Sequence, residues 1–170
     1  GAVYRHNVKY KNFKENDLLN FSINKKSYGN AKIEAENIIR KLQLNNNFYL
    51  PTIIRPFTFS GIGINKNNNY AFDSFIRSRA LGIDIKLETS GKGIRSYMHP
   101  LDFSKWILVI MGKNFIPLIN FGSDNAIKIF DLATTIANIK FKNLPRVSVF
   151  KGNRIDNNYY VPNIELAREI

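Results

Sequence analysis

The chain has 170 residues, no cysteine, two histidines and a formal net charge of +12 at pH 7, so it can bury one domain-sized core. The lack of cysteine excludes disulfides and thiolate sites, and two histidines argue against a histidine-rich metal site. No apolar run approaches the ~20 residues that span a bilayer, and the scattered basic residues argue against a nucleic-acid interface; we expect a cytoplasmic protein.

The first part of the chain is expected to run from a strand into a loop, a helix and a second strand. Residues 1–4 are predicted to end a strand, and residues 5–26 to form a polar loop. Ser27 is predicted to cap a helix that continues to about Leu44, where residues 45–47 stop it. The apolar stripe of this helix is expected at Ile33, Ile38, Ile39 and Leu42. Residues 52–59 read as a buried strand, and residues 65–69 as a polar loop.

The rest of the chain is predicted to alternate in the same way. In order, we expect helix 70–81, strand 83–87, turn 91–93, strand 95–98, helix 100–111, strand 116–121, helix 129–139, strand 146–150 and a short helix capped by Asn163. Gly82 and Gly112 are expected to end the first two of these helices, and Pro100 to begin the second. This alternation favours α/β layering.

Tyr28 and Lys32 form the most informative pair in the sequence. Residues four apart on a helix lie on the same face, one turn from each other. A lysine ammonium beside a phenol favours the phenolate, which makes the tyrosine a proton shuttle usable near neutral pH. The pair is therefore a candidate catalytic site, with a half-buried tyrosine and a solvated lysine as the alternative.

Four stretches carry a resemblance to a known family. They are residues 27–36 (S-Y-x-x-S/A-K-x-x-x-E in the family), 54–63 (L-R-x-F-N-V-Y-G-P-G), 94–102 (V-R-D-Y-I-H-V-x-D) and 120–129 (Y-N-V-G-S-G-x-x-x-S-I). Because their order and separations also fit, the chain resembles the extended short-chain dehydrogenase/reductase family, in its nucleotide-sugar epimerase/dehydratase branch.

The resemblance implies an α/β fold that consists of the second half of a Rossmann-type domain plus a smaller mixed α/β substrate-binding domain. Residues 1–64 would be the remainder of the NAD-binding domain, with the Tyr-x-x-x-Lys helix. Residues 65–170 would be mainly the substrate-binding domain, with 116–121 returning to the Rossmann sheet. The Gly-x-Gly-x-x-Gly turn is missing, since the glycine pairs at 61–63 and 91–93 lack the third glycine. We therefore expect a carboxy-terminal portion that is inactive alone, with the family's catalytic Ser or Thr standing just before Gly1.

Roles for individual residues follow from the same resemblance. Tyr28 and Lys32 would be catalytic, and both would also contact the cofactor, Lys32 through the nicotinamide ribose. Pro56 and Phe57 would lie near the nicotinamide through backbone contacts. Substrate-binding residues would be Thr58, Tyr70, Phe72 and Arg95, with Arg95 clamping the pyrophosphate. Core packing is the alternative for Tyr70 and Phe72, Arg55 and Asp102 are expected to be structural, and no metal is expected.

The implied function is an NAD-dependent nucleotide-sugar epimerase that acts through a 4-keto intermediate. Family dehydratases and decarboxylases place a carboxylate in the two positions that Gly1 and Ala2 occupy here, so a reaction that needs no such acid is favoured. A 4-keto-sugar reductase, a non-catalytic nucleotide-binding module and a basic nucleic-acid-binding domain stay open. The expected partners are a nucleotide-diphosphate sugar, NAD (with NADP as the alternative) and a second copy bound through the Tyr28–Lys32 helix.

Overall fold

The computed structural model describes residues 3–4, 11–17, 19, 27–45, 50–61, 70–113, 115–140 and 145–170. Its elements, in chain order, are α1 (Tyr28–Asn45), β1 (Ile53–Pro56), α2 (Ala71–Ala80), β2 (Ile85–Lys86), β3 (Ile94–Arg95), α3 (Pro100–Met111), β4 (Leu118–Phe121), β5 (Ile127–Lys128), α4 (Ile129–Ala137), β6 (Val149–Phe150), β7 (Tyr159–Tyr160) and α5 (Glu165–Arg168). The predicted α/β alternation is confirmed. The predicted loop at 65–69, most of that at 5–26, and Gly1 and Ala2 lie outside the described residues.

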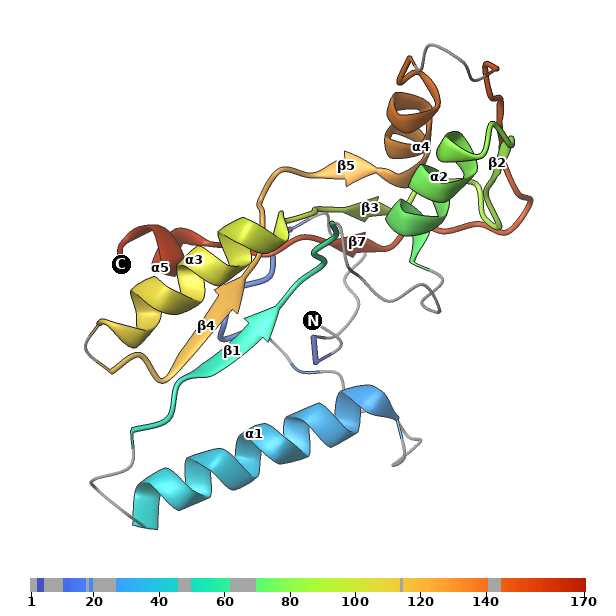
Figure 1. Cartoon of the computed structure of the whole chain (residues 1–170). Coiled ribbons are helices and arrows are strands. Elements are labelled where there is room, and N and C mark those ends of the chain that lie inside the picture. The colour runs from blue at the N-terminus through green and yellow to red at the C-terminus, as the bar shows by residue number, and fades with distance from the viewer. Residues whose placement is uncertain are drawn as a thin grey trace.

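The strands form three small sheets. β1 and β4 pair in parallel, from Ile53 opposite Leu118 to Pro56 opposite Phe121. β2 pairs in parallel with β6, while β3 lies between antiparallel β5 and parallel β7. In Figure 1 the β1–β4 pair runs between α1 and α3, and α2 and α4 lie together at the far end of the molecule. The segment predicted at 116–121 therefore pairs with the strand that follows α1.

Helix boundaries follow local signals in the sequence. The Ser27 hydroxyl accepts a hydrogen bond from the Asn30 N–H at 3.3 Å, which caps α1 where predicted. α3 has Pro100 at its start and Gly112 at its end, as predicted, and the His99 imidazole caps its first turn. Gly82, which follows α2, adopts a φ of 67°, the left-handed conformation that ends many helices. Asn163 accepts from the Glu165 N–H at 3.0 Å at the start of α5.

The predicted apolar stripe of α1 is wrong as an account of what the helix buries. Ile33 and Glu36 are the buried residues of α1, whereas Ile38 is 54% exposed and Leu42 is 52% exposed. Helical spacing identifies a face but does not say what covers it. A charged residue thus takes one of the two buried positions.

The predicted strands are longer than those observed, because backbone pairing changes partner along them. The run predicted at 52–59 leaves β4 after the Phe57 N–H donates to the Phe121 carbonyl at 2.7 Å. The chain then exchanges hydrogen bonds with Met98, which donates to the Thr58 carbonyl and accepts from the Ser60 N–H. The strand predicted at 95–98 likewise becomes β3 followed by an isolated bridge between Met98 and Phe59.

Two hydrophobic cores stabilise the two ends of the molecule. The first joins α2, α4 and β2 and consists of Phe75, Ile85, Leu87, Leu132, Ala133, Ile136 and Ala137. The second lies against α1 and the end of β1 and consists of Val3, Tyr4, Phe13, Ile33 and Phe57. On the α3 side, Phe103 and Trp106 make edge contacts with Phe121 of β4. Arg79, buried in α2, donates to the carbonyls of Ile139 and Pro145 and so ties α2 to the chain after α4.

We predict that Gly91→Ala destabilises the fold whereas Gly112→Ala does not. Gly91 has a φ of 71°, and an added Cβ would lie 2.8 Å from the Phe130 Cβ. The left-handed conformation alone costs an L-residue about 1–2 kcal/mol. Gly112 has a φ of −89° and its nearest contact would be at 3.6 Å, so its replacement should change stability by less than about 0.5 kcal/mol. Urea unfolding measures the stability of both variants. Equal unfolding midpoints would contradict the prediction that Gly91, unlike Gly112, needs to be glycine.

Candidate functional site

Tyr28 and Lys32 occupy the first two turns of α1 and share one face. The Lys32 Nζ lies 5.4 Å from the centroid of the Tyr28 ring, within the range of a cation–π contact. Tyr28 is 68% exposed and Lys32 is exposed as well. Both polar groups are therefore accessible to a ligand.

A buried ion pair attaches this helix to the sheet. Glu36, one turn beyond Lys32, accepts from the Arg55 Nε at 2.8 Å and from its Nη2 at 2.7 Å. The Arg55 Nη1 donates to the Tyr4 hydroxyl at 3.0 Å and to the Glu15 carbonyl at 2.9 Å. Burial alone would lower the pKa of Arg55, but its bonds to Glu36 and Tyr4 raise it above the ordinary value. One guanidinium thus joins β1 to three other segments.

Asn120 continues this network in the neighbouring strand. It is fully buried in β4, opposite Arg55 in the register. Its Oδ1 accepts from the Tyr4 hydroxyl and its Nδ2 donates to the Phe13 carbonyl at 2.9 Å, while its backbone N–H donates to a Glu15 carboxylate oxygen. Burial raises the pKa of Tyr4, so this phenol stays neutral and donates.

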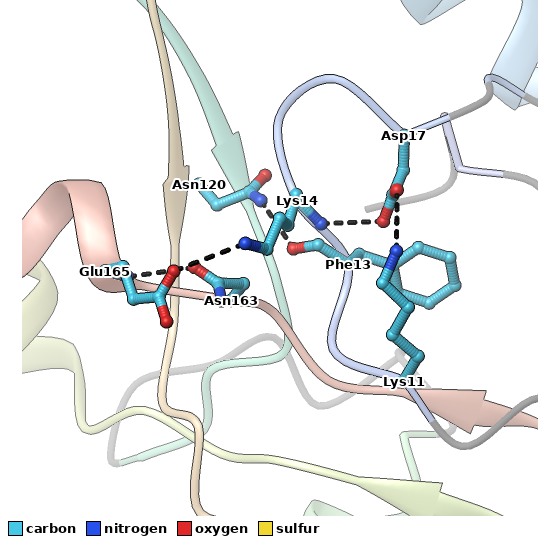
Figure 2. A network of polar contacts seen from close by, with 7 residues as sticks. All are labelled: Lys11, Phe13, Lys14, Asp17, Asn120, Asn163 and Glu165. Carbon is cyan, nitrogen blue, oxygen red and sulfur yellow. Dashed lines mark hydrogen bonds and ion pairs between the residues drawn. The ribbon is translucent and has the colours of Figure 1, made fainter.

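The segment 11–17 is held between Asn120 and the C-terminal part of the chain (Figure 2). Inside the segment, the Asp17 carboxylate accepts from the Lys14 N–H at 2.8 Å and pairs with Lys11. Towards the C-terminus, the Asn163 N–H donates to the Phe13 carbonyl at 2.7 Å and Lys14 pairs with Glu165 at 3.4 Å. The loop above α1 therefore has a defined path where the structure describes it.

The residues expected to approach a nicotinamide follow Arg55 directly. Pro56 is exposed, while Phe57 is buried and its ring stacks on Tyr160 with centroids 4.5 Å apart. The Phe57 ring belongs to the second core and is closed to a ligand, whereas Pro56 beside it is exposed. Thr58 is half-buried, and its carbonyl accepts from the Met98 N–H at 3.1 Å.

The residues expected to bind substrate lie around Tyr97. Phe72 packs on the Tyr97 ring with centroids 5.4 Å apart, and Tyr70, 57% exposed, precedes α2. The Arg95 Nη1 donates to the carbonyls of Ile94 and Asn158 at 2.8 and 2.9 Å, which ties β3 to the chain before β7. Among the described residues, no contact joins this group to Tyr28 or Lys32.

Sequence reasoning missed Glu36 and Asn120 as buried members of the site. Glu36 had a usable signal, because it repeats the Tyr28–Lys32 spacing once more and an arginine in an apolar strand needs an acid partner. Asn120 had no such signal. The structural role expected for Arg55 is confirmed by its contacts.

Other kinds of site find no support in the described part of the chain. These residues contain no group of three His, Cys, Asp or Glu side chains that could hold a metal ion. They also include no helix with the length and apolar character needed to cross a membrane. A groove of about 420 Å³ lies between β1 and the end of α3, lined by residues such as Ile54, Ile110 and Phe115, and no predicted site residue borders it.

Comparison of the chain with models of known protein families identifies one family. Residues 5–118 match the model of the NAD dependent epimerase/dehydratase family. No curated protein sequence matches the chain.

Solved structures of several nucleotide-sugar enzymes share the fold. The chain superposes on UDP-glucose 4-epimerase from Thermotoga maritima with a TM-score of 0.83 at 18% identity, covering 99% of this chain and 53% of that one. UDP-N-acetylglucosamine 4-epimerase from Bacillus cereus gives 0.78 at 20%, covering 99% and 56%. dTDP-glucose 4,6-dehydratase from Bacillus anthracis, a complex with NAD, gives 0.74 at 19%, covering 99% and 52%. The predicted fold class is confirmed, and the chain spans about half the length of the structures it matches.

The environment of Tyr97 predicts a pH dependence of stability. Burial, with a smaller contribution from the Asp73 charge, raises the pKa of Tyr97 from 10.0 to about 12 against the opposing effect of Arg95. Between these values the unfolded phenol loses its proton while the folded one keeps it, so this contribution to stability is present below pH 10 and is lost as pH rises towards 12.

Wild type should therefore lose roughly 1.4 kcal/mol more stability than Tyr97→Phe between about pH 9 and pH 11. Urea unfolding of both proteins at the two pH values measures this difference. A constant difference between the two proteins would refute the predicted dependence.

Proposed function

Since the chain belongs to the NAD-dependent epimerase/dehydratase family, we propose that it supplies the catalytic pair and the substrate-binding part of a nucleotide-sugar epimerase. The observation that carries the proposal is the exposed Tyr28–Lys32 pair, on a helix that the Glu36–Arg55 ion pair attaches to β1. The activity is proposed for the completed enzyme, by which we mean this chain together with a dinucleotide-binding half of the kind that the family resemblance implies.

The residues present fit the nicotinamide end of NAD. The Lys32 ammonium is exposed beside Tyr28. Pro56, the last residue of β1, is exposed as well. NAD, when bound, supplies reversible hydride acceptance from the C4 carbon of the sugar. The Gly-x-Gly-x-x-Gly turn for its pyrophosphate is not part of this sequence, so that contact belongs to the other half of the completed enzyme.

In the proposed reaction Tyr28 would take the proton of the C4 hydroxyl as this carbon becomes a ketone, with NAD, when bound, as the hydride acceptor. Lys32, whose Nζ lies 5.4 Å from the centroid of the Tyr28 ring, would donate to the nicotinamide ribose. After rotation of the 4-keto sugar, return of the hydride to its other face would regenerate the C4 hydroxyl, with Tyr28 giving the proton back to the oxygen. Electrons and protons balance, so the reaction has no net redox change.

Epimerisation is favoured over elimination by the residues that precede Val3. A dehydratase needs an acid there to handle the C5 proton and the C6 leaving group, and Gly1 and Ala2 have no side chain that can exchange a proton. Return of the hydride to the opposite face of a 4-keto sugar needs no such acid. The reaction class is therefore proposed as 4-epimerisation.

The substrate is proposed to be a nucleotide-diphosphate sugar that extends from Tyr28 towards the Tyr97 region. Arg95 would bind the pyrophosphate through the guanidinium nitrogens that do not hold Ile94 and Asn158. Thr58, Tyr70 and Phe72 would line the path between. In this proposal residues 1–64 complete the NAD-binding domain and residues 65–170 mainly form the substrate-binding domain.

A homodimer through α1 is part of the proposal, as is a cytoplasmic location. One exposed stripe of the helix carries apolar residues at i, i+4, i+7 and i+11, namely Ala31, Ala35, Ile38 and Leu42. This spacing suits packing against another helix. The stripe is distinct from the face that buries Ile33 and Glu36, so a second copy could dock without displacing the sheet.

We predict that the completed enzyme interconverts the C4 epimers of a UDP-sugar with added NAD. Tyr28→Phe should lower turnover by about 10²–10⁴-fold, because the ring remains but the proton acceptor is gone. Lys32→Ala should lower turnover and NAD affinity together. Chromatographic resolution of the products of UDP-glucose and UDP-N-acetylglucosamine measures the reaction.

Lys41→Ala is the matched control, since Lys41 is a second exposed lysine of α1, and it should leave turnover unchanged. Near-normal turnover of Tyr28→Phe would refute the catalytic assignment. Accumulation of a 4-keto-6-deoxy sugar would instead identify a dehydratase, and stoichiometric NAD(P)H consumption would identify a reductase.

Arg95→Ala is predicted to weaken binding of a UDP-sugar by roughly 2–3 kcal/mol, because a charge-assisted contact to phosphate is lost. Arg154→Ala, an exposed arginine of the same region, is the control and should bind normally. Calorimetry on the completed enzyme measures both. Equal affinity of wild type and Arg95→Ala would leave Arg95 with only its structural contacts to Ile94 and Asn158.

A further inference from the structure

Within the described residues, α1, which carries Tyr28 and Lys32, buries few side chains against the rest of the chain. Of its 18 residues, Ile33 and Glu36 are buried, and the others are half-buried or exposed. The apolar contact of Ile33 holds α1 against the second core, but it does not fix the angle of the helix relative to β1. Among the described residues, Glu36 is the buried polar residue of α1, and its bonds to Arg55 restrict the orientation of the helix.

The bonds between Glu36 and Arg55 fix both the distance between the two side chains and their relative orientation. The Glu36 carboxylate receives two parallel N–H bonds from Arg55, at 2.8 and 2.7 Å, in the planar fork that only arginine provides. The remaining Arg55 nitrogen is held by Tyr4 and by the Glu15 carbonyl, so the fork cannot turn freely. Pro56 and Phe57, the proposed nicotinamide contacts, come next in the chain.

A small error in this attachment has a large effect at Tyr28. Glu36 and Tyr28 are eight residues apart, which is about 12 Å along a helix. A tilt of about 5° at Glu36 would move Tyr28 by about 1 Å over that length. A displacement of this size in a catalytic group can cost on the order of 10²-fold in rate.

We propose that Arg55 is a positioning residue, which acts through Glu36 to set where Tyr28 and Lys32 stand relative to the strand end at Pro56 and Phe57. The catalytic part of this inference rests on the proposed function. The geometric part concerns the chain alone and is independent of any activity.

The geometric part can be tested by distance measurement. Because the chain has no cysteine, spin labels can be placed at Asn37→Cys on α1, outside the proposed dimer stripe, and at Lys105→Cys on α3, both exposed positions. Arg55→Lys keeps the charge but loses the fork, and should shift or broaden the electron–electron distance distribution between the labels. Arg79→Lys is the matched control, since Arg79 is equally buried but bonds to backbone carbonyls in the α2–α4 region, and it should leave the distribution unchanged.

The catalytic part is tested by steady-state kinetics of the completed enzyme. Arg55→Lys should lower kcat by on the order of 10²-fold while KM for the UDP-sugar changes by less than about two-fold. Arg79→Lys should alter neither constant. If Arg55→Lys does not fold, Glu36→Gln replaces it, because glutamine keeps the shape of the side chain and removes its charge. We then expect the same fall in kcat and the same change in the distance distribution.

An unchanged distance distribution, or parallel changes in the Arg55→Lys and Arg79→Lys proteins, would overturn the proposal. A fall in kcat matched by an equal rise in KM would also overturn it. A wild-type enzyme without epimerase activity would refute the proposed function, while the distance measurement would still decide whether Arg55 orients α1.

Discussion

The Glu36–Arg55 ion pair is the contact on which the arrangement around α1 depends. Removing two charges from water costs several kcal/mol per ion, and a buried pair recovers this only when its geometry is good and its other groups are bonded. Here the Arg55 nitrogen that does not bond to Glu36 donates hydrogen bonds to the Tyr4 hydroxyl and the Glu15 carbonyl. Buried ion pairs in general are often no more stabilising than apolar contacts of equal volume. The two parallel bonds between Arg55 and Glu36 nevertheless restrict the orientation of the two side chains, which an apolar contact does not do.

The two cores of the molecule are joined by a strand that changes partner. β1 pairs with β4, and the residues after it bond to Met98, which is close in sequence to Tyr97 and Arg95. The ring of Phe57 meanwhile stacks on Tyr160 of β7, so the strand is fixed by its side chains where its backbone switches. Residues 55–60 therefore connect the proposed catalytic helix with the proposed substrate region.

Features set by local chemistry could be predicted from the sequence, whereas features set by distant partners could not. Ser27, Pro100 and Gly112 set helix ends through contacts within one turn, and the Tyr28–Lys32 face follows from helical geometry alone. Strand lengths depend on pairing with segments far along the chain, so the predicted strands were too long. The burial of Asn120 depends on Tyr4, 116 residues away, and no local pattern records that contact.

The position of segment 11–17 has a consequence for the order in which the chain folds. The Phe13 backbone bonds to Val161 and Asn163, and Asn12 accepts from the Tyr159 hydroxyl across 147 residues. During synthesis residues 11–17 are made well before residues 159–163, with which they bond. Contacts of such separation carry a large loop-closure entropy and form late. Segment 11–17 thus takes its native path only after residues 159–163 have been made, and until then the aromatic ring of Phe13 lacks its contact with Tyr160 and needs protection from aggregation.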